Sequence, residues 1–192
     1  MRILVACEFS GIVREAFKAK GHDAWSCDLL PSERPGNHIQ DDVLKHLDEG
    51  WDLMIAHPPC TYLSNAGARF LYPRGVLDQQ RLQMGLKAKD FFLKLYNSSI
   101  AKICIENPIP STVYALPTRS QIIQPYHFGH SLQKKTCLWL KGLPALKPTN
   151  IVEAGESTKI AGNWFNKGGK DRQRNRAKTF PGIAAAMADQ WG

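Results

Sequence analysis

The sequence predicts an α/β fold built on a mainly parallel, doubly wound sheet. Short, uninterrupted apolar runs, typical of strands buried on both faces, alternate with stretches whose apolar residues recur at helical spacing. Several of these apolar runs end in polar clusters. Because doubly wound sheets bind ligands beyond the carboxyl ends of their strands, the clusters indicate a functional site at that edge.

The first apolar run, Ile3–Cys7, predicts a strand, and the following turn at Phe9–Gly11 ends it. Apolar residues at helical spacing then predict a helix at 12–20, which Gly21 stops. The next apolar run, Ala24–Cys27, predicts a second strand that ends on an acidic residue. A strand, a helix and a second strand in this order form a βαβ unit.

The middle of the chain repeats this alternation. A short helical stretch fits 44–49, and the apolar run Leu53–Ala56 predicts the third clear strand. A longer helix is expected at 77–96, before a strand at 102–105. We therefore expect these strands to lie parallel in one sheet.

The last third gives weaker patterns. Strands are expected at 121–124 and 136–140, paired with each other, and the segment 142–169 is rich in Gly, Pro, Asn and Lys and predicts irregular structure. A helix of small residues is expected at 183–191. Taken together with the length of 192 residues, this predicts a single domain, 1–192, with an irregular basic segment at about 142–180.

Composition excludes several classes of protein. Hydrophobic residues make up 43% and charged residues 22%, which is normal for a soluble globular protein and argues against a disordered or fibrous chain. No apolar stretch reaches the roughly 20 residues that span a bilayer, so we expect no membrane protein. The apolar run at the N-terminus is too short for a signal peptide and predicts a cytoplasmic protein.

The cysteines and the charge point to partners. The five cysteines lie at least 20 residues apart, which predicts neither a disulfide framework nor a Cys-rich metal site. The net charge of +8 predicts a polyanionic partner such as nucleic acid, although solubility alone also explains a moderate excess. Six basic residues and one acid give 167–178 a net charge of +5, which suits either a solvated loop or a phosphate-binding arm.

Two polar clusters could carry chemistry. The sequence His57-Pro58-Pro59-Cys60 follows the strand at 53–56, and its prolines prevent further pairing, so Cys60 is presented on a rigid loop. Glu106 follows the strand at 102–105. A thiol and a carboxylic acid at one sheet edge suit a nucleophile and its acid partner. The alternative is an inert thiol and an ordinary surface carboxylate.

The residues around both clusters resemble motifs of the DNA cytosine-5 methyltransferase family. The stretch from Asp52 to Gly67 resembles its Pro-Pro-Cys motif, and Glu106-Asn107 resembles its Glu-Asn motif. Phe9-Ser10-Gly11 and Asp42-Val43 are similar to its cofactor-binding segments, and all four occur in the family's order. The resemblance implies a Rossmann-like, S-adenosylmethionine-dependent methyltransferase fold that acts on DNA.

The resemblance also implies roles for individual residues. The residues with an implied catalytic role are Cys60, Glu106, Asn107 and Lys135. The residues with an implied role in cofactor binding are Phe9, Ser10, Gly11, Asp28, Asp42 and Pro58. The resemblance and the basic stretch together imply that the substrate or DNA is bound by Ser64, Gln133, Lys170, Arg172, Arg174 and Arg176.

The implied reaction is methyl transfer from S-adenosylmethionine to carbon 5 of cytosine. The Cys60 thiolate would add to carbon 6, and Glu106 would stabilise the protonated ring nitrogen 3. A basic neighbour would help Cys60 to ionise, and His57 and Lys135 are both candidates for that neighbour. The cytosine would be flipped out of a duplex or taken from a single strand.

The sequence departs from the family at several points. Val13 and Arg14 replace glycines, Thr61 replaces a glutamine, and Lys135 stands where the family has a bidentate arginine. The segment 142–180 is too short for a full target-recognition region, so a partner protein for target recognition is expected. Two alternatives therefore stay open: carbon-5 modification of a free pyrimidine nucleotide or single strand, and a catalytically silent nucleic-acid-binding relative.

Overall fold

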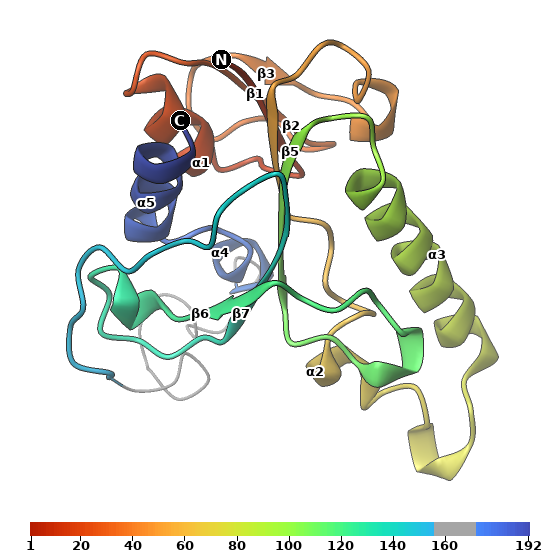
Figure 1. Ribbon diagram of the computed structural model, residues 1–192. Helices are drawn as coiled ribbons and strands as arrows, with labels where there is room; N and C mark the ends of the chain where they lie inside the picture. Colours follow the sequence, from red (N-terminus) through yellow and green to blue (C-terminus); the bar gives the residue numbers. More distant parts are fainter. Residues whose placement is uncertain (156–171) are drawn as a thin grey trace.

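A computed structural model describes residues 1–155 and 172–192 (Figure 1). Within these ranges the strands form one sheet in the order β3-β2-β1-β4-β5-β7-β6. The strands are β1 (Arg2–Ala6), β2 (Asp23–Cys27), β3 (His38–Ile39), β4 (Leu53–Ala56), β5 (Lys102–Pro108), β6 (Gln121–Ile123) and β7 (Thr136–Lys141). The strands β1 to β5 run parallel, and β7 is antiparallel to both of its neighbours, β5 and β6.

Helices cover both faces of this sheet. Figure 1 shows α1 (Ile12–Lys18) and α5 (Pro181–Trp191) on one face and α3 (Gln79–Tyr96) on the other. Alternate residues of β1 pack toward opposite faces, because side chains in a strand alternate in direction. Ile3 and Val5 belong to the core beneath α1 and α5, whereas Leu4 and Ala6 belong to the core beneath α3.

The remaining helices in the described residues are short. The α-helical ones are α2 (Asn65–Ala68) and α4 (Arg172–Arg176), and the 3-10 turns are η1 (Val43–Lys45), η2 (Pro73–Gly75), η3 (Thr112–Tyr114) and η4 (Pro125–His127). No helix in the described parts of the chain is long and apolar enough to cross a bilayer. The connections after β1 and β4 leave the sheet next to each other, because these strands lie side by side at its centre.

The doubly wound, Rossmann-like α/β fold class is confirmed, because the chain leaves β1 toward β2 and β3 and then returns to add β4 and β5 on the other side. The strands predicted at 121–124 and 136–140 do pair with each other. The strand predicted at 102–105 is longer and runs through Pro108. A proline is tolerated there because β4 stops opposite Ile105, which leaves β5 only β7 as a neighbour.

Several short elements were not expected. The pattern predicts neither β3 nor α2, because two and four residues are too few to show a period. The basic segment at about 142–180 was expected to be irregular, but its residues Arg172–Arg176 form the helix α4. The stretch from 143 to 155 contains no helix or strand, as expected.

Candidate active site

The candidate site lies where the order of the strands reverses, between β1 and β4. The carboxyl ends of these two parallel strands are neighbours, so the loop that begins at Cys7 and the loop that begins at His57 emerge side by side. Crevices of this kind are the usual ligand sites of doubly wound sheets. The polar clusters predicted from the sequence are therefore brought to one edge.

A cavity of about 250 Å³ opens on one side of this edge. Its walls combine three carboxylates with apolar side chains, and the residues that line it are Cys7, Cys27, Asp28, Leu29, Asp41, Asp42, Val43, Pro59, Ala88 and Phe91. Two predicted cofactor-binding residues, Asp28 and Asp42, belong to this wall. Asp41 was not predicted, although it directly precedes Asp42 in the sequence.

The other predicted cofactor residues lie beside the cavity rather than in its wall. Phe9 and Ser10 are buried, at 7% and 3% exposure. Gly11 precedes α1 with φ 67°, a left-handed conformation that favours glycine, and a Cβ atom there would lie 2.8 Å from Nη2 of Arg14. The carbonyl of Pro58 accepts a hydrogen bond from Asn107, and it is the next residue, Pro59, that faces the cavity.

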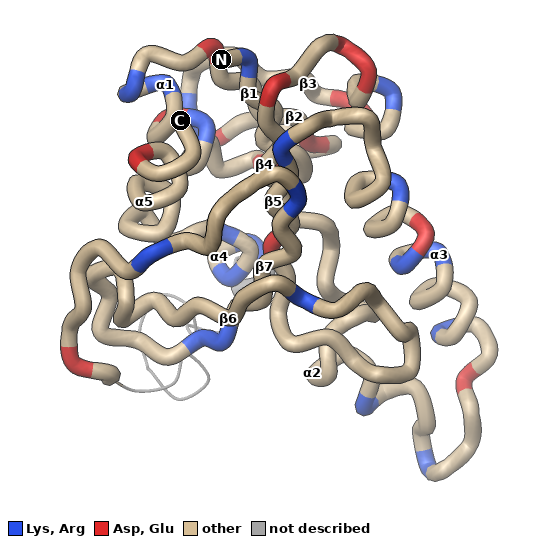
Figure 2. Tube along the Cα trace, viewed as in Figure 1, with Lys and Arg blue, Asp and Glu red and all other residues tan. Residues whose placement is uncertain are grey.

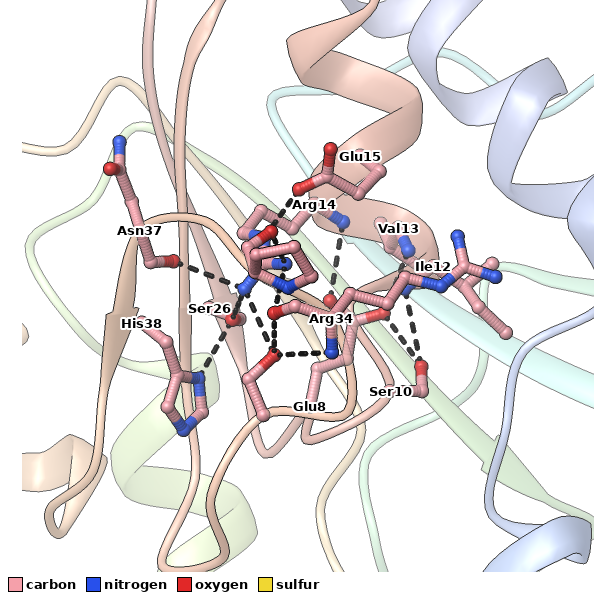
Figure 3. Close-up of polar contacts among 12 residues, drawn as sticks. Glu8, Ser10, Ile12, Val13, Arg14, Glu15, Ser26, Arg34, Asn37 and His38 are labelled. Atoms are coloured by element: carbon pink, nitrogen blue, oxygen red, sulfur yellow. Dashed lines mark hydrogen bonds and ion pairs between the residues drawn. The ribbon is translucent and has the colours of Figure 1, made fainter.

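Glu8 organises the turn between β1 and α1 (Figure 3). Its buried carboxylate accepts hydrogen bonds from the hydroxyl of Ser10 at 3.1 Å and from the backbone N–H groups of Val13 at 2.7 Å and Arg14 at 3.2 Å. These N–H groups belong to the first turn of α1 and have no partner within the helix. A carboxylate from the loop itself therefore caps the helix, a role that the sequence pattern did not reveal.

Arg14 fixes the neighbouring loop. Its fully buried guanidinium donates to the hydroxyl of Ser26 at 2.9 Å and to the carbonyls of Arg34 and Pro35 at 3.0 and 3.1 Å (Figure 3). The side chain thus ties α1 to β2 and to the loop that follows it. This accounts for Arg14 at a position where a small residue was expected from the resemblance.

Cys60 follows Pro59 in the loop and is not among the residues that line the cavity. Burial raises the pKa of its thiol, and the positive charges of Lys134 and Arg176 oppose this effect, while Glu106 reinforces it. The thiol is therefore surrounded by groups from three separate parts of the chain. Two cations and one carboxylate close to a single cysteine are an arrangement in which ionisation of the thiol can be coupled to ligand binding.

Glu106 lies on β5 in contact with His57, whose Nδ1 is 2.9 Å from Oε2. Burial raises the pKa of Glu106, but the hydrogen bond from His57 and the charge of Lys134 outweigh it, and the net direction is downward. Asn107 is also buried and donates to the carbonyl of Pro58 at 3.0 Å. Asn107 therefore fixes the Pro-Pro loop that carries Cys60.

Lys134 approaches the candidate nucleophile, whereas Lys135 is exposed and shifts the pKa of neither Cys60 nor Glu106. The backbone N–H of Lys134 donates to Gln124 at 2.9 Å, and its ammonium lies 5.8 Å from the centre of the Phe180 ring. The sequence analysis predicted Lys135 instead, because it stands at the position of an arginine in the motif that this segment resembles. Gln133 is exposed and donates to the carbonyl of Gly155 at 2.8 Å.

The basic helix α4 lies close to the segment that carries Lys134 (Figure 2). Arg174 and Lys178 both pair with Glu33, at 2.7 Å each, and the guanidinium of Arg174 lies 5.3 Å from the centre of the Phe9 ring. Arg176 is near enough to Cys60 to influence its pKa. Lys170 lies outside the described residues, as does the side chain of Arg172.

Ser64 has a local structural role. Its side chain is 6% exposed and accepts a hydrogen bond from the N–H of Gly67 at 3.2 Å, which caps α2. A Cβ atom on Gly67 would lie 1.9 Å from the carbonyl oxygen of Thr61, so glycine is required for this turn. The serine and glycine that trail Cys60 therefore shape the loop behind it.

Comparisons with known proteins give little further information. No family model and no curated protein matches the sequence. Among solved structures, the fold is similar to that of a prophage-encoded protein from E. coli described as a candidate DNA modification methyltransferase, with 14% identity and a TM-score of 0.47. The match covers 80% of this chain and 52% of that protein, so this chain spans about half of its length.

Proposed function

We propose that this protein is an S-adenosylmethionine-dependent methyltransferase that modifies carbon 5 of cytosine in DNA through a covalent adduct with Cys60. The observation that carries the proposal is the convergence of Cys60, Glu106 and Lys134 beside an acidic cavity at the switch point of a doubly wound sheet. Nucleophile, acid and cation come from three separate segments, the loop after β4, the strand β5 and the segment before β7.

The acidic cavity fits the cofactor. The carboxylates of Asp28 and Asp42 offer acceptors for ribose hydroxyls and an adenine amino group, and Val43 and Phe91 offer apolar contact for a flat ring. Asp41 lies in the same wall, where Lys45 pairs with its carboxylate at 2.7 Å, so Asp28 and Asp42 are the carboxylates that would favour a cationic sulfonium. Bound there, S-adenosylmethionine would supply an electrophilic methyl group.

The protein's own residues would activate the base. The sulfur of Cys60 bonds to carbon 6 of cytosine, the ring electrons move toward nitrogen 3, and the protonated form of Glu106 gives nitrogen 3 a proton. Carbon 5 is then enamine-like and accepts the methyl group. Loss of the carbon 5 proton to a base expels Cys60 as thiolate, the proton on nitrogen 3 returns to Glu106, and the aromatic ring is restored.

The cations support DNA as the substrate. The positive charges of Lys134 and Arg176 act on the Cys60 thiol. Arg174 and Lys178 add two further cations in and just after α4, and Glu33 pairs with both of them. The net charge of +8 is suited to a polyanion. A base in a duplex would have to leave the stack to reach Cys60, because the thiol is only partly exposed.

Labelled methyl transfer tests the proposal. Wild type and Cys60→Ser are given labelled S-adenosylmethionine with duplex DNA, single-stranded DNA or dCMP in parallel. Label on DNA that depends on Cys60 supports the proposal, and label on dCMP alone would assign a free nucleotide as substrate. Binding of DNA without transfer to any substrate would support a catalytically silent relative.

A further inference from the structure

His57 is a buried titratable residue with no part in the mechanism above. It follows β4 directly, and the pairing of Ala56 with Ile105 places it beside Glu106 on the neighbouring strand β5. Its side chain is 9% exposed and that of Glu106 is 14% exposed. The two side chains therefore meet in a region with little water, where a hydrogen bond to a carboxylate is strong.

The hydrogen bonds available to His57 indicate how its proton is arranged. Nδ1 lies 2.9 Å from Oε2 of Glu106, while Nε2 is buried and has no hydrogen-bond partner among the described residues. A doubly protonated ring would leave an N–H group buried and unpaired at Nε2, which is unfavourable. The arrangement therefore favours a neutral ring with its proton on Nδ1, donated to Glu106.

This contact distinguishes the two oxygens of Glu106. Oε2 is held by His57, and no described residue forms a hydrogen bond with Oε1. The oxygen that is not held is the one that can exchange a proton with a ligand. The titratable groups that interact electrostatically with Glu106 are His57 from the end of β4, Cys60 from the Pro-Pro loop, Lys134 from the segment before β7, Cys104 on β5 itself and Cys137 on β7.

We propose that His57 is a positioning residue for Glu106: its Nδ1–H group holds Oε2, turns Oε1 toward the base, and stabilises the carboxylate that forms when Glu106 protonates nitrogen 3. This inference rests on the proposed function. The proton moves from Oε1 to nitrogen 3 as the sulfur–carbon 6 bond forms, and it returns when that bond breaks. His57 keeps its own proton throughout.

Two variants of His57 test the inference. His57→Leu removes the hydrogen bond, and His57→Asn retains a donor near the position of Nδ1. The control is His46→Leu, because His46 forms a comparable contact with Glu49 at 2.6 Å. His46 also contacts Asp41 in the cavity wall at 3.4 Å, but neither of these carboxylates shifts the pKa of Glu106. The wild type and all variants are expressed with ¹³C-labelled glutamate. The Glu106 carboxyl resonance is assigned as the one that is lost in Glu106→Gln.

The direct measurement is the titration of Glu106, which does not require activity. We expect His57→Leu to raise the pH at which Glu106 titrates, because the hydrogen bond to the carboxylate is lost. The rise should be limited to about one unit, a tenfold change in proton affinity, because Lys134 still stabilises the carboxylate. We expect His57→Asn to restore most of the difference, and His46→Leu to leave the titration unchanged. The same titration in wild type and His57→Leu would overturn the proposal, even if methyl transfer by the wild type is established.

The second measurement is the pH dependence of adduct formation with DNA that contains 5-fluorocytosine. Because the step needs protonated Glu106, we expect the rate to fall at a higher pH in His57→Leu, from a lower plateau. If His57 had only a structural role, His57→Leu would lower the maximal rate of adduct formation without changing the pH at which the rate falls. A fall at the same pH in both proteins, or no fall in either, would contradict the role in proton transfer.

Discussion

The two sides of the functional edge differ in charge. The cavity beside β1 and β2 is lined by Asp28, Asp41 and Asp42, whereas the thiol beyond β4 is approached by Lys134 and Arg176. Pro59 lies between them, facing the cavity immediately before Cys60. An acidic pocket suits a cationic sulfonium and a basic rim suits a polyanion, so one short loop separates sites for two reactants of opposite charge.

This comparison predicts that changes on the basic side affect chemistry and leave cofactor affinity unaltered. We expect Glu106→Gln to slow adduct formation with 5-fluorocytosine DNA by about 10²- to 10⁴-fold, because general acid catalysis contributes that much. Calorimetry with S-adenosylmethionine should give the wild-type affinity. A comparable loss of cofactor affinity would mean that the two sides are not separate.

The acidic side should show the reverse. We expect Asp42→Ala to weaken S-adenosylmethionine binding by about 10- to 100-fold, because a hydrogen bond to a charged group contributes about 1.5–3 kcal/mol. Asp42 also caps η1, with its carboxylate accepting from the N–H of Leu44 at 3.0 Å. Asp42→Asn is the control, because it keeps an oxygen for the cap, and both variants should bind DNA as wild type does.

The smallest expected effect concerns the ionisation of Cys60. Burial raises its pKa, and Lys134 is the first of the groups that oppose this rise, so Lys134→Ala should raise the pKa further, by about one unit or less. The rate of iodoacetamide alkylation, followed against pH by mass spectrometry, would then reach its midpoint at a higher pH. Lys135→Ala should leave the midpoint unchanged, and an equal shift in both variants would contradict the assignment of Lys134.

The sheet and its edge could be predicted because buried parallel strands give continuous apolar runs. Leu53–Ala56 matches β4 residue for residue, and the strands at 3–7 and 24–27 agree with β1 and β2 to within one residue. Parallel strands then bring their carboxyl ends together, so the proximity of Cys60 and Glu106 follows from the order of the strands.

The details of the site depend on information that the sequence pattern lacks. Lys134 and Lys135 both precede β7, and a register error of one residue exchanges the side that each of them faces. Glu8 and Arg14 act through contacts with a helix terminus and a distant loop, which no local pattern records. The contact between His57 and Glu106 could have been predicted once β4 and β5 were recognised as neighbours, because their register places these residues side by side.

The central claim is that Cys60 is the nucleophile, and mapping the covalent adduct tests it most directly. The protein is incubated with S-adenosylmethionine and DNA that contains 5-fluorocytosine, digested, and analysed by mass spectrometry. We predict a cross-linked nucleotide on the peptide that contains Cys60, and none in Cys60→Ser. A cross-link on another residue, or methyl transfer to ordinary cytosine that persists in Cys60→Ser, would contradict the account.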